Sequence, residues 1–150
     1  GPNRSRLRFA PSRRDPARLR EVKVLLDTHI WLWSLADPGR LSKEAKRILG
    51  SRRNAIHLSA ASAWEMAIKV SIGKLELPEP VETYVPTRMA RQGITPLPVT
   101  HAHALKVSTL PPHHRDPFDR LLVAQAMVER LSLLTADPVF ARYGIDLISA

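Results

Sequence analysis

Five acidic side chains in this 150-residue chain have types and spacings that could do chemistry together. Each follows an expected strand, opens an expected helix or faces inward from one. Carboxylates gathered at such places repel one another unless a cation lies among them. Because the chain has no cysteine, oxygen ligation favours Mg²⁺ or Mn²⁺, ions that activate water and shield phosphate oxygens. The five residues are Asp27, Glu65, Asp116, Asp119 and Asp137.

Two of the five acids share helical stripes with apolar residues. A carboxylate that faces a core in this way must be paired, protonated or bound to a cation. The run from 121 to 128 is apolar at every position except Gln125, so we expect that helix to be buried on most sides. The stripe partners are Ala61, Ile68 and Ile72 for Glu65, and Val123 and Ala126 for Asp119.

Structural roles compete with the metal interpretation. Asp followed by Pro occurs four times, and this pair is an ordinary helix start. We interpret Asp37 as such a cap. Asp116 could be a cap, a metal ligand or both, and Asp27 could cap the helix that follows it. Glu65 and Lys69, four residues apart, could form a surface ion pair.

The elements that must position these acids alternate between strand and helix. Expected strands cover 21–27, 55–59, 94–99, 131–136 and 145–149. Expected helices lie within 28–36, 43–50, 60–75, 80–93, 100–110, 116–130 and 137–144. The helix in 60–75 is expected to end near Gly73, and the one in 80–93 to be interrupted at Pro86. This order predicts an α/β fold with a mostly parallel central sheet of about five strands flanked by helices. The prolines of 94–99 favour a sheet edge. Asp27 and Asp137 each follow a strand, so we expect them at the same carboxyl edge.

The chain suits one folded domain at 22–150. In front of it, residues 1–21 combine an apparent tag scar, Gly1-Pro2, with a basic extension that we expect to be flexible. Residues 1–20 hold seven arginines of a chain with net charge +9. The extension could be a solvated tail, bind nucleic acid or pair with the acidic cluster. No apolar run approaches the roughly 18 residues that span a bilayer, so we expect a cytoplasmic protein without membrane contact.

Four sequence motifs point to one family. They read, in order, "VLLDTHIWLW", "SAASAWEMAIKVSIGKL", "HRDPFDRLLVAQA" and "LLTADPVF". Together they resemble the motifs of the PIN-domain ribonucleases, most closely the VapC-type toxins of toxin–antitoxin pairs, over residues 22–148. The resemblance implies a PIN-like fold and a metal-dependent endoribonuclease that hydrolyses RNA phosphodiester bonds with a water activated by Mg²⁺ or Mn²⁺. It also implies a cognate antitoxin as partner and a homodimer.

The resemblance assigns roles to the acids and their neighbours. Asp27, Glu65, Asp119 and Asp137 match the family's catalytic, metal-binding acids. Asp116 is the additional acid of the "DPFD" version and is implied as an auxiliary ligand. The positions that match hydroxyl groups beside the cluster are Thr28 and Thr135.

Basic and aromatic residues near the motifs have open interpretations. His113, His114, Arg115 and Arg120 lie beside the cluster and could hold the RNA backbone, although a solvated loop explains the two histidines equally well. We interpret the three tryptophans, Trp31, Trp33 and Trp64, as core or dimer packing in preference to base-stacking platforms.

Two other functions remain to be weighed. A phosphatase with a nucleophilic aspartate would need a second aspartate two residues after the first, but Asp27 is followed by Thr28 and His29. A non-catalytic RNA-binding or scaffold protein of the same fold is the alternative to the nuclease. The complete set of acids argues against it.

Overall fold

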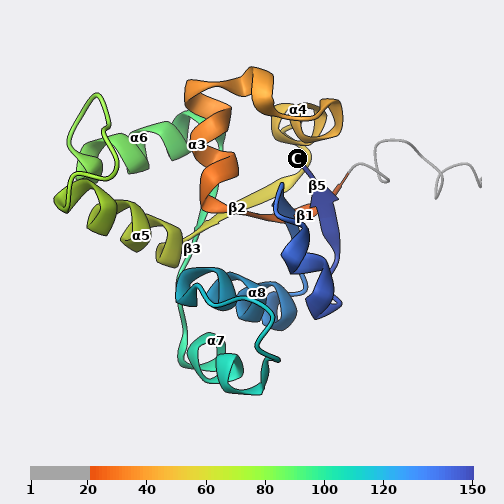
Figure 1. Ribbon diagram of the computed structural model, residues 1–150. Coiled ribbons are helices and arrows are strands. Elements are labelled where there is room, and N and C mark those ends of the chain that lie inside the picture. Colours follow the sequence, from red (N-terminus) through yellow and green to blue (C-terminus); the bar gives the residue numbers. More distant parts are fainter. Residues whose placement is uncertain (1–20) are drawn as a thin grey trace, which may run out of the picture.

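The computed structural model describes residues 21–150, which form a single parallel sheet covered by helices (Figure 1). All four pairs of neighbouring strands are parallel, and the strand order is β3-β2-β1-β4-β5. The predicted α/β architecture is therefore confirmed, and the proline-containing β3 lies at an edge as expected. The strands are β1 (Lys23–Leu26), β2 (Ala55–Ser59), β3 (Thr95–Leu97), β4 (Ser132–Thr135) and β5 (Leu147–Ser149).

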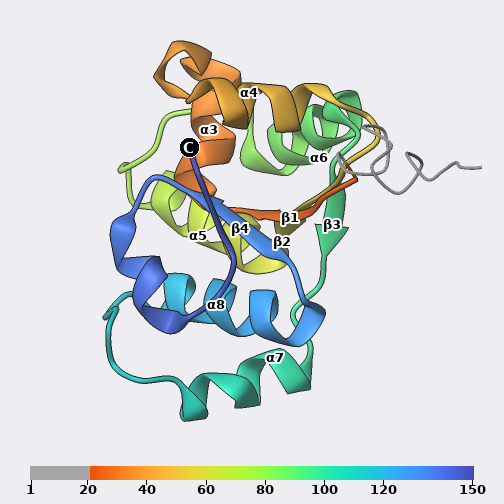
Figure 2. The same ribbon diagram turned by 90° about the vertical axis from the view of Figure 1, so that its right-hand side faces the viewer.

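Helices cover both faces of the sheet, as Figure 2 shows with α3 and α4 on one side and α7 and α8 on the other. The α-helices are α3 (Thr28–Ala36), α4 (Lys43–Gly50), α5 (Ala60–Ser71), α6 (Val81–Gln92), α7 (His101–Lys106) and α8 (Pro117–Glu129). The 3₁₀ segments within residues 21–150 are η3 (Pro38–Arg40), η4 (Val107–Thr109) and η5 (Pro138–Tyr143). Within the described part of the chain, no helix is both long and apolar enough to cross a bilayer.

The core is divided into two layers because successive side chains of a strand point to opposite faces of the sheet. Val24 and Leu26 of β1 join a cluster formed with α3, α4, α5 and α6. Leu25, between them in sequence, joins a second cluster formed mainly with α8. All three side chains are fully buried, which explains why β1 reads as a continuous apolar run.

Some helix boundaries agree with the sequence prediction and others differ from it. The long helix expected to end near Gly73 does so, since α5 ends at Ser71 and the chain turns through Gly73 at φ +78°. The region 100–110 divides into α7 and η4, and 137–144 forms the 3₁₀ segment η5. Asp37 occupies the N-cap position of η3 with Pro38 after it, as predicted, but its side chain makes no cap hydrogen bond.

Helix α6 runs through Pro86, which we expected to interrupt it. A proline removes the hydrogen bond to the carbonyl four residues earlier, here that of Glu82. Both Pro86 and Glu82 are exposed, so water can reach the carbonyl that is left free. Thr87 adds a hydrogen bond from its Oγ1 to the Thr83 carbonyl at 2.7 Å.

The basic extension and its Gly1-Pro2 start, predicted for residues 1–21, lie outside the described residues except for Glu21. The described chain from Glu21 enters the sheet at Lys23. From there, three elements carry the predicted acids to one edge of the sheet: the end of β1, the helix α5 that follows β2, and the helix α8 that precedes β4.

Candidate active site

Asp27 lies at the carboxyl edge of the sheet, directly after β1. Parallel pairing of β1 with β4 sets Leu26 opposite Leu134, and the backbone N–H of Asp27 donates to the Leu134 carbonyl at 3.0 Å. Thr135, the last residue of β4, donates from Oγ1 to Asp27 Oδ2 at 2.7 Å. Asp27 occupies the N-cap position of α3, but its side chain accepts no cap hydrogen bond. Its carboxylate therefore faces the site and does not cap the helix.

Glu65 comes to the same edge from α5, a helix that Ser59 caps by accepting from the Ala61 N–H at 2.9 Å. The Glu65 side chain is 4% exposed. Lys69 donates to its Oε2 at 2.8 Å, while Oε1 is buried without any hydrogen-bond partner. The pair is therefore not the surface pair considered as an alternative. The stripe prediction was right for Ala61 and Glu65 and wrong for Ile72, which is exposed.

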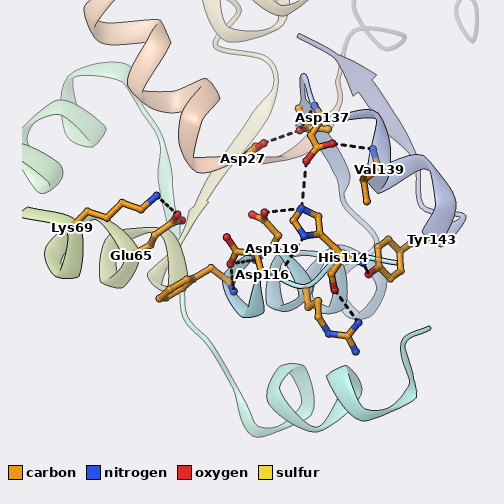
Figure 3. A network of polar contacts seen from close by, with 12 residues as sticks. Asp27, Glu65, Lys69, His114, Asp116, Asp119, Asp137, Val139 and Tyr143 are labelled. Atoms are coloured by element: carbon orange, nitrogen blue, oxygen red, sulfur yellow. Dashed lines mark hydrogen bonds and ion pairs between the residues drawn. The ribbon is translucent and has the colours of Figure 1, made fainter. Parts of the chain in front are cut away.

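Asp116 and Asp119 reach the edge from the first turn of α8. Asp116 caps the helix, since its Oδ1 accepts from the N–H groups of Phe118 at 2.8 Å and Asp119 at 3.4 Å. Asp119 points inward, along the stripe whose next members, Val123 and Ala126, are buried as predicted. Figure 3 shows Asp27, Glu65, Asp116 and Asp119 directed toward a common space, with Asp137 above them.

His114 penetrates the cluster. Its Nε2 lies 2.9 Å from Asp119 Oδ2 and 3.3 Å from Asp137 Oδ2 (Figure 3), but the ring N–H is aligned with neither oxygen as a hydrogen bond. Nδ1 accepts from the Asp116 N–H at 3.2 Å, which assigns the ring proton to Nε2 in the neutral form. The solvated-loop interpretation of His114 was therefore wrong.

The loop around His114 is held by several contacts. Tyr143 accepts from the His114 N–H through its hydroxyl oxygen at 2.7 Å, and His113 packs edge-on against the Tyr143 ring at 5.1 Å. Arg120 donates to the carbonyls of Pro111, Val107, Leu110 and His114 at 3.0 to 3.5 Å. Arg120 therefore fastens this loop, which differs from the expected role of a free RNA contact. Arg115 is exposed, and its RNA contact stays a prediction.

The two predicted hydroxyl positions play different parts. Thr135 donates to Asp27, as described, and its Oγ1 also accepts from the Asp137 N–H at 3.0 Å. Asp137 in turn accepts from the Val139 N–H at 3.0 Å and so caps η5. Thr28 donates instead to Ser62 at 2.8 Å, which ties α3 to α5.

The five carboxyl groups of the site have too few positive charges beside them, and this raises the pKa of two of them. Burial, followed by repulsion from Asp116, Asp27, Glu65 and Asp137, raises the pKa of Asp119 to about 8. Burial also raises the pKa of Asp27, although the hydrogen bond from Thr135 opposes the shift. The hydrogen bond to Glu65 raises the pKa of Lys69, so the ammonium form is favoured. Lys69 thus neutralises one carboxylate of five.

The donor types fit a hard divalent cation, since the cluster offers carboxylate oxygens with one buried Glu65 oxygen lacking a partner. Within residues 21–150, however, no three acidic or histidine side chains already stand at positions that would hold one ion together. His114 lies between Asp119 and Asp137, so these two carboxylates could share an ion only after the imidazole turns aside.

The three tryptophans lie in different surroundings. Trp31 is fully buried and donates from Nε1 to Gln92 at 2.7 Å, as core packing predicts. Trp33 is partly buried and has the Arg40 guanidinium 3.9 Å from its ring centroid. Trp64 is 61% exposed and meets Phe118 edge-on at 5.2 Å. Core packing is therefore wrong for Trp64.

Comparison with known proteins agrees with this architecture. A family model described as the PIN domain matches residues 24–146. Ribonuclease VapC22 of Mycobacterium tuberculosis is 32% identical over 117 residues, which cover 76% of this chain and 86% of that protein. Ribonuclease VapC16 of the same organism is 57% identical over 60 residues, which cover 40% of this chain and only 43% of that protein.

Solved structures share the fold at low sequence identity. A chain in the crystal structure of VapBC2 from Rickettsia felis, bound to a DNA fragment from its promoter, superposes with a TM-score of 0.66 at 17% identity and covers 85% of this chain and 98% of its own length. A chain of DNA-bound VapBC from Salmonella typhimurium gives a TM-score of 0.64 at 18% identity, with the same coverage of both chains.

Proposed function

The chain belongs to the PIN-domain family, and on this premise we propose that it is a divalent-metal-dependent endoribonuclease, the toxin of a toxin–antitoxin pair. One observation supports this function above the others. Asp27, Glu65, Asp116, Asp119 and Asp137 meet at one edge of the sheet, where repulsion and burial raise the pKa of Asp119 to about 8. A purely structural cluster would be expected to supply its own counter-charges.

The residues of the site divide the work of binding the cation. Asp27, Glu65, Asp119 and Asp137 would hold Mg²⁺ or Mn²⁺, with the Asp116 oxygen not used in capping as an auxiliary ligand. A divalent cation bound there supplies Lewis acidity to the phosphate and lowers the pKa of a water molecule. Thr135 fixes the orientation of Asp27 through the 2.7 Å hydrogen bond.

Lys69 and His114 add donors around the carboxylates. The Lys69 side chain is 38% exposed, so its ammonium group can hold Glu65 and meet an RNA phosphate. The Nε2–H of His114 faces Asp119 and Asp137, where it offers partial positive charge in place of a cation. The same N–H is the donor that His114 would offer to an RNA phosphate bound beside the cluster.

Cleavage of RNA by the purified protein tests the proposal. We expect an RNA substrate to be cut internally with Mg²⁺ or Mn²⁺ and to stay intact with EDTA, and we expect the Asp27→Asn variant to be inactive. Cleavage that persists in EDTA, or an Asp27→Asn variant with full activity, would contradict the metal mechanism. The alternative of a non-catalytic RNA-binding protein predicts RNA binding without cleavage under all these conditions.

The partners follow from the same premise. We propose a cognate antitoxin and a homodimer, acting in the cytoplasm because RNA is the substrate. The solved relatives are VapBC assemblies by their descriptions. Trp64 of α5 and Ile72, directly after that helix, are exposed and offer apolar surface for a second copy. Sedimentation that finds only a 16.8 kDa species at micromolar protein would contradict the homodimer.

A further inference from the structure

A pocket of about 220 Å³ opens beside the acidic cluster, on the side of α3. Two of its walls are the carboxylate residues Asp27 and Asp137, so whatever fills the pocket touches the proposed catalytic site. The remaining walls are mainly apolar. The lining residues are Asp27, His29, Ile30, Trp33, Ala136 and Asp137.

Trp33 gives this pocket an aromatic wall whose position is fixed. The Arg40 guanidinium lies over the Trp33 ring, 3.9 Å from its centroid, and so covers one face of the indole. The ring also packs partly against the core that contains Ile30. A ring held in this way loses little conformational entropy when a second flat group packs against it.

The size and chemistry of the pocket suit one nucleobase. An apolar cavity of about 150 Å³ holds a benzene molecule, so 220 Å³ accommodates the six-membered ring of a pyrimidine. Unpaired bases stack on aromatic side chains and present hydrogen-bonding edges. His29 is exposed at the rim, where its imidazole can meet such an edge.

We propose, on the basis of the function proposed above, that this pocket takes the base of an unpaired nucleotide next to the scissile phosphate, with the base against Trp33 and its polar edge toward His29. The walls that the pocket shares with the acidic cluster favour this occupant over a protein side chain, because a base in the pocket places its own phosphate beside the carboxylates. Trp33 is then a substrate-binding residue, contrary to our interpretation of it as packing.

Binding of RNA without cleavage tests this directly. The background is the Asp119→Asn variant of the full chain, which is expected to be inactive, and the probe is a short unstructured RNA labelled at one end, in Mg²⁺. Trp33→Leu removes the ring but keeps an apolar side chain, and we expect it to weaken binding about 5- to 30-fold. Trp33→Phe keeps an aromatic ring and should stay within about 3-fold of the background.

Two further variants are controls. One tests whether filling the pocket weakens binding while Trp33 is kept, and the other tests whether any exposed tryptophan contributes to RNA binding. Ala136→Leu adds bulk at another lining residue of the pocket, at an exposed position, and should weaken binding as Trp33→Leu does. Trp64→Phe changes the exposed tryptophan on α5, which does not line this pocket, and should leave binding unchanged. Thermal melting of each variant shows that it is folded before its binding is measured.

Abasic RNAs locate the base that enters. Replacing one base at a time by an abasic site should reveal a position where the loss of binding disappears in Trp33→Leu, because the two changes remove the same contact. Two results would contradict the proposed base pocket without contradicting the proposed nuclease. One is a Trp33→Leu variant that binds RNA as tightly as its background. The other is an abasic position whose loss of binding depends on Trp64 and not on Trp33. An Asp119→Asn background that binds no RNA, together with a parent chain that cleaves none, would overturn both.

A second copy of the chain is the competing occupant. If Trp33→Leu abolished self-association in sedimentation while RNA binding stayed unchanged, the pocket would belong to a protein interface and the proposal would fall. We expect the opposite pattern, with self-association unchanged and RNA binding weakened.

Discussion

Buried polar groups lie at both ends of α8, but donors meet acceptors at one end, whereas carboxylates crowd together at the other. Near the C-terminal end of α8, the side chain of His103 from α7 is fully buried, and both of its ring nitrogens have polar partners. Its Nδ1 accepts from the Thr100 N–H at 3.0 Å and lies 3.3 Å from Gln125 Nε2, while Nε2 lies 2.6 Å from Glu129 Oε2. The accepting Nδ1 leaves the proton on Nε2, which donates to Glu129.

At the start of α8, the polar groups repel one another. Asp119 faces four other carboxyl groups, and its pKa is raised to about 8 by burial and by that repulsion. Three buried side-chain polar atoms within residues 21–150 lack a hydrogen-bond partner, and two of them, Glu65 Oε1 and His114 Nε2, lie in this cluster. The third is Gln125 Oε1, in the His103 network.

The difference separates structure from function. The His103 network joins α7 to α8, and apart from the Gln125 oxygen its buried polar groups are partnered by groups of opposite hydrogen-bonding type from the chain itself. The acidic cluster leaves negative charge that the chain does not neutralise, as sites that bind a ligand or cation do. Changes in the first should alter stability and changes in the second should alter activity, and each prediction below tests that division.

The largest expected effect is on activity in the cluster. Asp27→Asn should lower the rate of RNA cleavage about 10³-fold or more, equivalent to about 4 kcal/mol in the barrier, because a ligand of the proposed cation is lost. Without metal, its melting temperature should be unchanged or higher, since repulsion falls. Asp37→Asn, the same change at an exposed helix start, is the matched control and should keep full activity.

The next effect is on stability in the other network. His103→Ala should lower the free energy of unfolding by about 3 kcal/mol, because it leaves a cavity and strands the Thr100 N–H. The activity per folded molecule should change little. Leu105→Ala, at an exposed position of the same helix, is the control and should be nearly neutral. A large loss of activity in folded His103→Ala protein would show that the two networks are coupled.

Metal binding should stabilise through the cluster alone. A cation that binds only the folded state adds about 2.7 kcal/mol at 100 times its dissociation constant, so the melting temperature should rise with Mg²⁺ or Mn²⁺. The increment should persist in His103→Ala and disappear in Asp119→Asn. If Mg²⁺ or Mn²⁺ stabilised both variants equally, the cation would bind at a site other than the acidic cluster.

The sequence predicted which strand ends and helix starts carry most of the acids, because these positions follow from backbone periodicity. Strand ends give the place of Asp27 and Asp137, whereas the Asp-Pro pair predicts only that Asp116 opens α8. The order of the elements did not place Asp116 and Asp119 at the same edge of the sheet. The inward position of Asp119 follows from its helical stripe. These features are local, so spacing and capping chemistry are enough to predict them.

Contacts between distant segments could not be predicted in this way. The Thr135–Asp27 hydrogen bond joins residues 108 apart in sequence, and it requires the pairing of β1 with β4. His114 was expected as a neighbour of the cluster, but its entry depends on Tyr143 and Arg120, which hold its loop from other elements. The pocket beside Trp33 likewise needs α3 and the segment after β4 to meet.

The raised pKa of Asp119 should make the stability of the folded protein depend on pH. The pKa of Asp119 is about 8 in the folded protein against the ordinary 3.8, so the folded state binds this proton more tightly. The stability that this proton provides is complete below about pH 4 and is lost as the pH rises toward 8. In EDTA, the melting temperature should therefore fall across this window relative to that of Asp119→Asn. Parallel profiles of the two proteins would contradict the raised pKa.

The smallest expected effect concerns Asp116, which has both a structural and a possible functional role. It caps α8 and also faces the acidic cluster (Figure 3). Serine is as good a cap as aspartate, so Asp116→Ser should change the free energy of unfolding by less than about 0.5 kcal/mol, whereas Asp116→Ala should cost about 1 kcal/mol. If capping is its main role, Asp116→Ser should keep activity while Asp119→Ser loses it. Removing the Asp116 charge should also lower the pKa of Asp119, because Asp116 is the largest source of repulsion on it after burial. Equal loss of cleavage in Asp116→Ser and Asp119→Ser would show that Asp116 is a full ligand, and the start of α8 would then serve the cation with both carboxylates.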